Sequence, residues 1–252
     1  MILNLIYSPL EQFQILPLFL CKESVFSMTN MTFFLGVSLL MFLFLLYLLF
    51  EKTSMLIPNR IQVIFENLYG VVFRLIYDNI GNSGKALFPY IFFLFFFILI
   101  LNVIGLVPYS FTVTSHLIVT FSIALFTFIG VNVICFRKHG VNMLTLFLPP
   151  GASLPLALLL IPIEFVSYLF RPISLSVRLF ANMMAGHTLL KVIAGFAWTM
   201  LLTGTPVMLI LHFVPLGLLV LLMGLEFGVA LIQAYVFTIL TCIYLNDAIH
   251  LH

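Results

Sequence analysis

Long, uninterrupted stretches of apolar residues, separated by short polar segments, set the pattern of this chain. The first three stretches cover residues 31–50, 87–107 and 112–136. Each is close to the roughly 20 residues that a helix needs to cross the hydrocarbon core of a bilayer. We therefore expect three membrane-spanning helices in the first half of the chain.

Residues 60–81 follow a different pattern, in which charged and apolar side chains are interspersed. The charged positions are Arg60, Glu66, Arg74 and Asp78, and the apolar ones include Ile61, Ile64, Phe65, Leu68 and Leu75. This pattern predicts an amphipathic helix that lies at the membrane interface. A solvated linker helix is the alternative that the pattern leaves open.

The second half of the chain contains two apolar stretches that are much longer, at residues 154–203 and 206–246. Forty helical residues reach about 60 Å, which is about twice the thickness of the hydrocarbon core. Each stretch is therefore two spans joined by a turn or one strongly tilted helix. We favour a hairpin of two long tilted helices, because a turn at membrane depth would leave backbone groups unsatisfied.

Composition agrees with this pattern, since 63% of the 252 residues are hydrophobic and only 7% are charged. A soluble domain carries about 25% charged residues. The fold class is therefore an all-α membrane protein, with a tail at residues 1–30 and a single membrane domain at 31–252. The sequence leaves removal of a short N-terminal presequence open. It has no basic run for nucleic acid, and its three cysteines lack metal-binding or disulfide spacing, so we expect no cofactor.

Charged residues are rare in the two long helices, and a charge at the bilayer centre costs about 2.5–3.5 kcal/mol on insertion scales. Glu164, Arg171 and Arg178 fall within about 40° of one another on an ideal helix. Ser174 and Asn182 lie one turn either side of Arg178, so a polar stripe follows one helix face. Arg178 has no carboxylate at i±3 or i±4, which suggests a partner on another chain.

The other polar residues of these helices lie on separate faces. His187 is about 180° round the helix from Arg178, and therefore faces a different partner or compartment. Glu226 and Gln233 are seven residues apart and share a face of the last helix. Structural roles remain open for some of these residues. Arg171 and Lys191 are long enough to reach an interface, Glu164 can act as a cap, and Asn182 and Gln233 can bridge helices.

One block of the apolar stretch at residues 154–203 reads Arg171-Pro-Ile-Ser-Leu-Ser-Val-Arg-Leu-Phe-Ala-Asn-Met-Met-Ala-Gly-His187. This block resembles the signature of the a subunit of F-type ATP synthases. The last apolar stretch is similar to that family's last helix. The similarity rests on Glu226, Gln233 and Tyr235 and on the ending Tyr244-Leu-Asn-Asp-Ala248. Looser similarity covers Pro58-Asn-Arg-Ile-Gln and the segment Asn102-Val-Ile-Gly-Leu-Val-Pro-Tyr-Ser-Phe-Thr-Val-Thr-Ser-His116. The resemblance extends over most of the chain from about residue 30.

This resemblance implies a proton-conducting subunit that has no catalytic site of its own. Two aqueous half-channels would open onto a rotating c-ring of proteolipid subunits, with Arg178 facing a ring carboxylate and blocking proton leakage. The implied proton path contains Glu226, His187, Glu164, Asn182, Gln233, His116, Asn102, Ser174 and Tyr235. Further implied partners are peripheral-stalk b-type subunits and other membrane-sector subunits. The implied location is the mitochondrial inner membrane, with a bacterial plasma membrane as the alternative.

Two other classes of membrane protein compete with this interpretation. Another polytopic ion-transport or respiratory-chain subunit would explain the buried charges, although it would not explain the block around Arg178. A membrane hydrolase or haem protein needs a nucleophile–base pair or facing histidines. The sequence has neither a Gly-x-Ser-x-Gly nor a His-Glu-x-x-His motif, and its histidines show no haem-like pairing.

Overall fold

The described part of the molecule is built from helices, which confirms the predicted all-α membrane fold. The computed structural model describes residues 8, 10–18, 28–51, 60–107, 110–140, 154–203 and 205–249. Within these residues, five helical segments are long and apolar enough to cross a membrane. Most of the predicted N-terminal tail, the proline-rich loop before residue 154 and the turn residue Gly204 lie outside the described residues.

The first half of the chain supplies three helices that agree closely with the sequence pattern. They are α1 (Asn30–Glu51), α2 (Arg60–Ile80) and α3 (Phe88–Gly105), and the short 3-10 helix η3 (Gly81–Leu87) joins the last two. A second 3-10 helix, η2 (Glu11–Phe13), precedes α1. Helix α2 is amphipathic as predicted: it buries Val72, Leu75, Ile76 and Ile80, while Glu66, Arg74 and Asp78 are exposed.

The expected span at 112–136 begins later than predicted, because its first residues are not α-helical. Residues 113–115 form the 3-10 helix η4 (Val113–Ser115), and α4 covers Leu117–His139. The Ser115 hydroxyl donates to the carbonyl of Thr112 at 2.6 Å, and the Thr112 hydroxyl donates to Ser115 Oγ at 2.8 Å. Such local side-chain bonds compete with helical backbone pairing. His116 then has extended backbone angles and occupies the N-cap position of α4, without a capping hydrogen bond from its side chain to the described residues.

The two long apolar stretches form the expected hairpin, with one correction. Helix α5 covers Leu154–Leu202 without a break, and contains Pro162 and Pro172. The second stretch is not one helix, since α6 (Pro206–Leu211) and α7 (Phe213–Ile249) are separated at His212. Pro215 explains the break, because its ring has no N–H to donate to the carbonyl of Leu211 and crowds that carbonyl.

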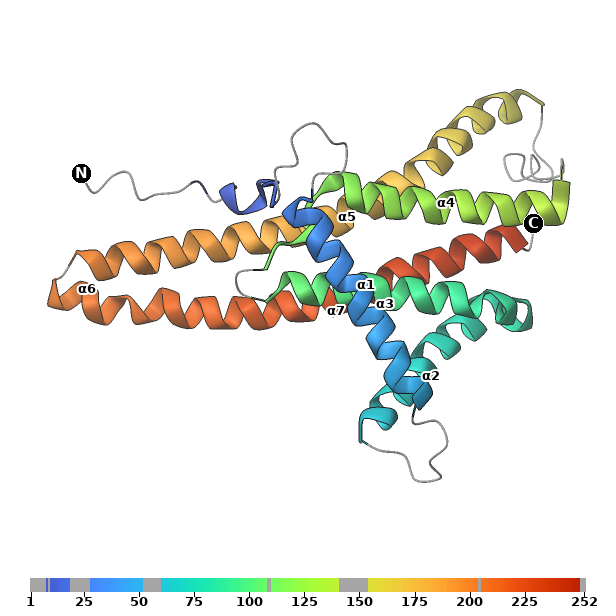
Figure 1. Ribbon diagram of the computed structural model, residues 1–252. Coiled ribbons are helices and arrows are strands. Elements are labelled where there is room, and N and C mark those ends of the chain that lie inside the picture. The colour runs from blue at the N-terminus through green and yellow to red at the C-terminus, as the bar shows by residue number, and fades with distance from the viewer. Residues whose placement is uncertain are drawn as a thin grey trace.

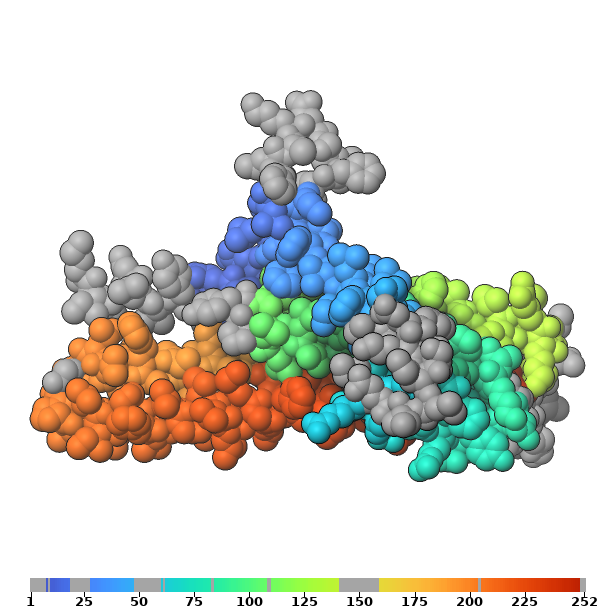
Figure 2. Space-filling model, turned by 60° about the horizontal axis from the view of Figure 1, so that its bottom comes forward, coloured from blue at the N-terminus to red at the C-terminus, as the bar shows by residue number. Residues whose placement is uncertain are grey.

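Helices α5 and α7 lie side by side, and α6 lies at the tip of the hairpin (Figure 1). The rest of the bundle gathers at the other end, where α7 also contacts α2, α3 and α4. The main apolar core lies there, around Phe96, Leu179, Phe237 and Leu245. Toward α6 the outer surface of the hairpin is uncovered on the face that Figure 2 shows. Near α6, this face of the hairpin is therefore open to lipid or to another subunit.

Candidate functional site

Three polar contacts between α5 and α7 follow one another along the hairpin. Nearest the tip, His187 Nε2 lies 3.5 Å from Glu226 Oε1. Asn182 Nδ2 donates to Gln233 Oε1 at 2.9 Å. Furthest from the tip, Arg171 Nη1 lies 3.3 Å from Asp247 Oδ2. The antiparallel arrangement of the two helices explains this order, since residue numbers rise along α5 while they fall along α7.

The His187–Glu226 contact is the most deeply buried of the ionisable pairs in the described residues, with side-chain exposures of 16% and 6%. Neither carboxylate oxygen of Glu226 has a hydrogen-bond partner among the described residues, and the same holds for Nε2 of His187. Buried polar atoms in this state need water or a proton carrier to satisfy them. Gly186 makes room for the pair, because a Cβ atom there would lie 2.5 Å from Glu226 Oε1.

A groove of about 880 Å³ leads to this pair. Its volume is large enough for a chain of water molecules. The groove brings α5 and α7 together with the α3–α4 connection and the N-terminal segment. Its polar and charged lining residues are Gln12, Asn30, Ser110, His187, Lys191 and Glu226. The structure therefore gives the buried His187–Glu226 pair a wide connection to the surface.

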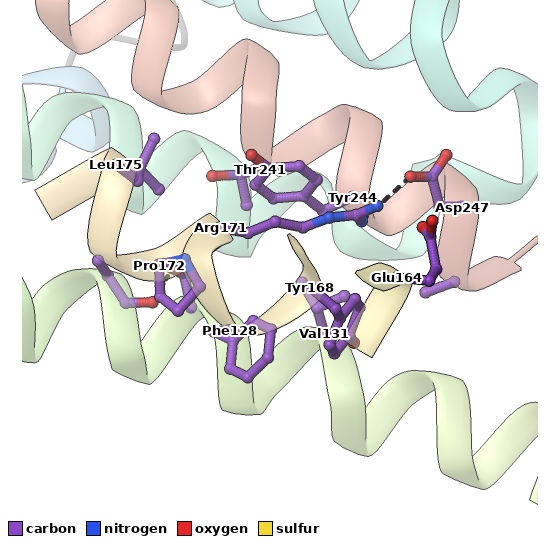
Figure 3. A pocket seen from close by; sticks show the side chains of 13 residues that line it. Phe128, Val131, Glu164, Tyr168, Arg171, Pro172, Leu175, Thr241, Tyr244 and Asp247 are labelled. Atoms are coloured by element: carbon purple, nitrogen blue, oxygen red, sulfur yellow. Dashed lines mark hydrogen bonds and ion pairs between the residues drawn. The ribbon is translucent and has the colours of Figure 1, made fainter. Parts of the chain in front are cut away.

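A second, much smaller pocket surrounds Arg171 at the other end of the α5–α7 contact. Its volume is about 40 Å³, and its polar lining residues are Thr127, Glu164, Tyr168, Arg171, Thr241, Tyr244 and Asp247. Figure 3 shows the Arg171 side chain extending from α5 toward Asp247 on α7, with Glu164 nearby. The guanidinium carbon lies 5.1 Å from the ring centroid of Tyr168 and 5.0 Å from that of Tyr244. Arg171 is thus held by one carboxylate and two aromatic faces.

Arg178 lies between these two ends of the hairpin and differs from its polar neighbours. Its side chain is exposed, as are those of Ser174 and Asn182 on the same predicted stripe. Among the described residues, none forms a hydrogen bond or a salt bridge with the Arg178 guanidinium. Ser176 and Met183, which lie about 160° and 140° round α5 from Arg178, are buried. The packing of α5 therefore turns the permanently charged Arg178 outward, away from the bundle.

The remaining predicted site residues are spread over three places. Asn102 on α3 is fully buried and donates to the backbone carbonyl of Ala230 on α7 at 3.3 Å. His116 stacks on Phe111, with ring centroids 5.1 Å apart, and burial lowers the pKa of its imidazole below the ordinary value. Tyr235 is 41% exposed on the outer side of α7. These three residues do not contact the His187–Glu226 pair directly.

Comparisons with known proteins agree with one another on the family. A profile of the family described as "ATP synthase A chain" matches residues 31–246. The chain is 58% identical to ATP synthase subunit a of Pylaiella littoralis over 247 residues, which covers 97% of this chain and 99% of the relative. It is 50% identical to that of Chondrus crispus over 250 residues, covering 98% of each chain. The chain belongs to the ATP synthase subunit a family.

Membership of the subunit a family establishes the general function of the chain. It makes the chain an a subunit of the F-type ATP synthase and a membrane protein of the proton-translocating sector. A third relative, ATP synthase subunit a of Brassica napus, is 46% identical over 252 residues and is covered over 97% of its length. The similarity to these three relatives therefore extends over nearly the whole chain, and not only over the Arg178 block.

Sequence reasoning missed several residues that shape the site in this subunit a. Asp247, Tyr168 and Tyr244 surround Arg171, and Gly186 gives space to Glu226. Helical spacing offered a partial signal, since Tyr168 precedes Arg171 by three residues and Tyr244 precedes Asp247 by three. No spacing rule, however, joins residues 76 positions apart, as in the Arg171–Asp247 pair. The register between α5 and α7 was needed to place those residues together.

Proposed function

We propose that this a subunit conducts protons through two aqueous half-channels against a rotating c-ring and couples their flow to ATP synthesis. In this proposal it has no catalytic site of its own. The observation that supports it best is the state of Arg178. Its polar neighbours Arg171, Asn182 and His187 all meet partners on α7, whereas Arg178 is exposed and has none among the described residues. A carboxylate on a neighbouring subunit would satisfy it.

The wide groove supports the first half-channel. Water in this groove would deliver protons to Glu226 and His187, two side chains that exchange protons when their surroundings bring them near the working pH. The Asn182–Gln233 contact comes next along the hairpin, between the His187–Glu226 pair and Arg178 in chain order, and supplies polar atoms on the route toward the ring. Asn102, His116, Ser174 and Tyr235 complete the proposed path.

The second half-channel would begin near Glu164, on the opposite side of Arg178 along α5. Its carboxylate lines the small pocket around Arg171, where it would receive protons that leave the ring. The two half-channels would then reach α5 at different heights. A proton would have to travel between them on the ring, because Arg178 repels a proton that takes the direct route.

The chemistry at the ring follows from the cost of burying a charge. A carboxylate that faces lipid favours its protonated form, because desolvation disfavours the anion. When it reaches Arg178, the fixed positive charge favours the anion, and the proton leaves into the half-channel beside it. Moving one charge through 100 mV is worth about 2.3 kcal/mol, so several protons per turn would drive rotation.

The proposed partners follow from the same assignment. They are the c-ring proteolipids at Arg178, peripheral-stalk b-type subunits and other membrane-sector subunits on the remaining surface, and the surrounding lipid. We place the complex in the mitochondrial inner membrane, with a bacterial plasma membrane as the alternative. Immunolocalisation of the subunit in fractionated cells distinguishes these two locations.

Replacement of Arg178 by alanine in the assembled synthase tests the proposal. ATP-driven proton pumping into vesicles should fall to the background level, because the ring carboxylate no longer loses its proton at the right place. Arg137→Ala is the matched control, since Arg137 is an exposed arginine in the last turn of α4 and should pump normally. Normal pumping by Arg178→Ala, with the ring proteolipid still co-purifying, would refute the proposed role.

A further inference from the structure

Arg171 and Arg178 lie on nearly the same face of α5, but only Arg171 has a charged partner among the described residues. They are seven residues apart, which places them about 20° apart around an ideal helix and about 10 Å apart along it. Arg178 is exposed, and none of the described residues pairs with it. Arg171 has a carboxylate partner and two aromatic neighbours. The contrast calls for an explanation, because both guanidinium groups carry a permanent positive charge.

The groups that hold Arg171 come from two helices and contact different parts of its guanidinium. Asp247 approaches one terminal nitrogen at 3.3 Å, while the rings of Tyr168 and Tyr244 lie about 5 Å from the central carbon. Figure 3 shows the guanidinium between these groups, inside the pocket. Tyr168 is itself fixed by a hydrogen bond from its hydroxyl to Asn132 Oδ1 on α4. We call Asp247, Tyr168 and Tyr244 the Arg171 clamp.

The clamp balances the positive charge of Arg171 without removing it. An aromatic face attracts a cation, and a paired carboxylate cancels most of its field at a distance. Without the clamp, Arg171 would become a second unpaired cation about 10 Å from Arg178, in surroundings where salt screens poorly. A carboxylate moving past α5 would then meet two attracting charges instead of one, and would bind at either.

We propose that the Arg171 clamp makes Arg178 the one cation that the ring carboxylate can engage, so that Asp247, Tyr168 and Tyr244 act as specificity-determining positioning residues for proton transfer. This inference rests on the proposed role of Arg178. It assigns no proton-carrying role to Asp247. The clamp keeps a competing charge out of the path of the ring.

An asymmetry between the two partners makes the proposal testable. If Arg171 is removed, Asp247 is left alone, and a lone carboxylate can become neutral by taking up a proton. If Asp247 is removed, Arg171 is left alone, and an arginine cannot become neutral in practice. Loss of Asp247 should therefore be much more harmful than loss of Arg171, although both changes break the same salt bridge.

The experiment compares Asp247→Asn, Arg171→Gln and the double variant in the assembled synthase. ATP-driven proton pumping is measured in vesicles and divided by the amount of ring proteolipid that co-purifies. We expect Asp247→Asn to slow pumping by about threefold or more, at the low end of the coupling found between charged neighbours. Arg171→Gln should pump at nearly the unaltered rate. The double variant should recover most of the loss, because the competing cation is gone.

Three outcomes would overturn the proposal. Equal losses in both single variants, with no recovery in the double, would mean that the salt bridge only holds α5 to α7. Slow pumping in both Asp247→Asn and the double variant, with normal pumping in Arg171→Gln, would mean that Asp247 carries protons itself. An unaltered rate in Asp247→Asn would mean that the clamp has no effect. The proposed function fails separately, through normal pumping by Arg178→Ala.

Changes in Tyr244 give a second test that leaves both charges in place. Tyr244→Leu removes one aromatic face, and should slow pumping less than Asp247→Asn does. Adding Arg171→Gln to Tyr244→Leu should reverse that loss. Tyr244→Phe keeps the ring and is the matched control, which should pump normally. If Asp247→Asn fails to assemble, Tyr244→Leu with and without Arg171→Gln still tests the proposal. A loss of pumping in Tyr244→Leu that Arg171→Gln does not reverse would contradict the role of the Arg171 clamp.

Discussion

The two ends of the α5–α7 contact hold an ionisable pair in different ways, since the Arg171–Asp247 pair is partly exposed and the His187–Glu226 pair is mostly buried. At one end, Arg171 and Asp247 sit at a pocket of about 40 Å³, and two aromatic rings cover the guanidinium. At the other end, His187 and Glu226 face a groove of about 880 Å³, and their polar atoms have no hydrogen-bond partners among the described residues. The first pair is held between fixed partners, while the second lies beside a groove that is large enough for water.

The chemistry of the side chains matches this difference in space. Arginine keeps its proton at any accessible pH, so a closed pocket with a carboxylate and aromatic faces stabilises it as a fixed charge. Histidine and glutamate change charge near neutral pH when their surroundings shift them, so they serve a path only where water reaches them. Arg178 lies between the two ends and belongs to neither, because it has an arginine's fixed charge without a partner among the described residues.

The largest effect is expected from removing the Glu226 carboxyl group at the wide end of the hairpin. Glu226→Ala should slow proton uptake through the membrane sector by about a hundredfold, the typical contribution of one positioned acid–base group. Passive proton flux in stripped vesicles gives the rate, and co-purification of the ring proteolipid verifies assembly. Glu226→Gln keeps the shape of the side chain without its titration and should be equally slow. An unaltered rate in Glu226→Gln would remove the contrast between the two ends.

The next effect tests whether the position of Glu226 matters as well as its charge. Gly186→Ala introduces a Cβ atom that would lie 2.5 Å from Glu226 Oε1, so the carboxylate must shift. The shift moves the carboxylate from its place beside His187, and we expect proton uptake to fall by about tenfold, because misplacing a reacting group slows transfer. Gly195→Ala is the matched control on the same helix, since no atom lies within 4 Å of its added Cβ.

Normal proton uptake in Gly186→Ala, together with normal uptake in Gly195→Ala, would show that Glu226 has room to move without loss. Proton transfer between His187 and Glu226 would then not depend on a fixed position of the Glu226 carboxylate. Slow uptake in both variants would instead point to a general effect on α5, and the measurement would say nothing specific about Glu226.

Much of the fold follows from the sequence because lipid permits few alternatives. A long apolar stretch must satisfy its backbone internally, so residues 31–50 and 154–203 predict helices that the structure has at Asn30–Glu51 and Leu154–Leu202. The errors arise where local chemistry competes with that rule. The hydroxyl bonds of Thr112 and Ser115 delay the start of α4, and Pro215 separates α6 from α7.

The sequence predicted most members of the candidate site, but spacing alone did not show which residues pair across α5 and α7. It also missed four residues that shape the site, Asp247, Tyr168, Tyr244 and Gly186. Charges within an apolar helix are conspicuous, so the sequence singled out Arg178 and His187. Helical spacing did not show that Asn182 and His187, about 140° apart around α5, would both contact α7. The partner of each residue depends on the register between α5 and α7, which spacing within one helix does not contain. Asp247 illustrates this limit, because near the end of the chain it looks like an ordinary solvated residue until α7 places it beside Arg171.

The smallest effect concerns His116, whose neighbour Phe111 lines the wide groove. Burial lowers the pKa of His116 below its ordinary 6.5, so the packed state favours the neutral ring. When the segment opens, the ring returns to its ordinary pKa and takes up a proton below about pH 6.5. Acid therefore favours the open state, and stability of this segment is lost as pH falls, by at most about tenfold in the opening equilibrium per pH unit.

Hydrogen exchange at the backbone amides of Val119 and Thr120, which donate to the carbonyl of His116, measures this opening. Between pH 7.5 and 5.5, exchange corrected for its intrinsic pH dependence should accelerate in the unaltered subunit, while His116→Gln should show no such acceleration. Equal acceleration in both would assign the response to another group. Acceleration in the unaltered subunit alone would extend the comparison between the two ends of the hairpin. It would mean that acid opens the segment at His116, beside the wide groove, in addition to any effect on the protonation of His187 and Glu226.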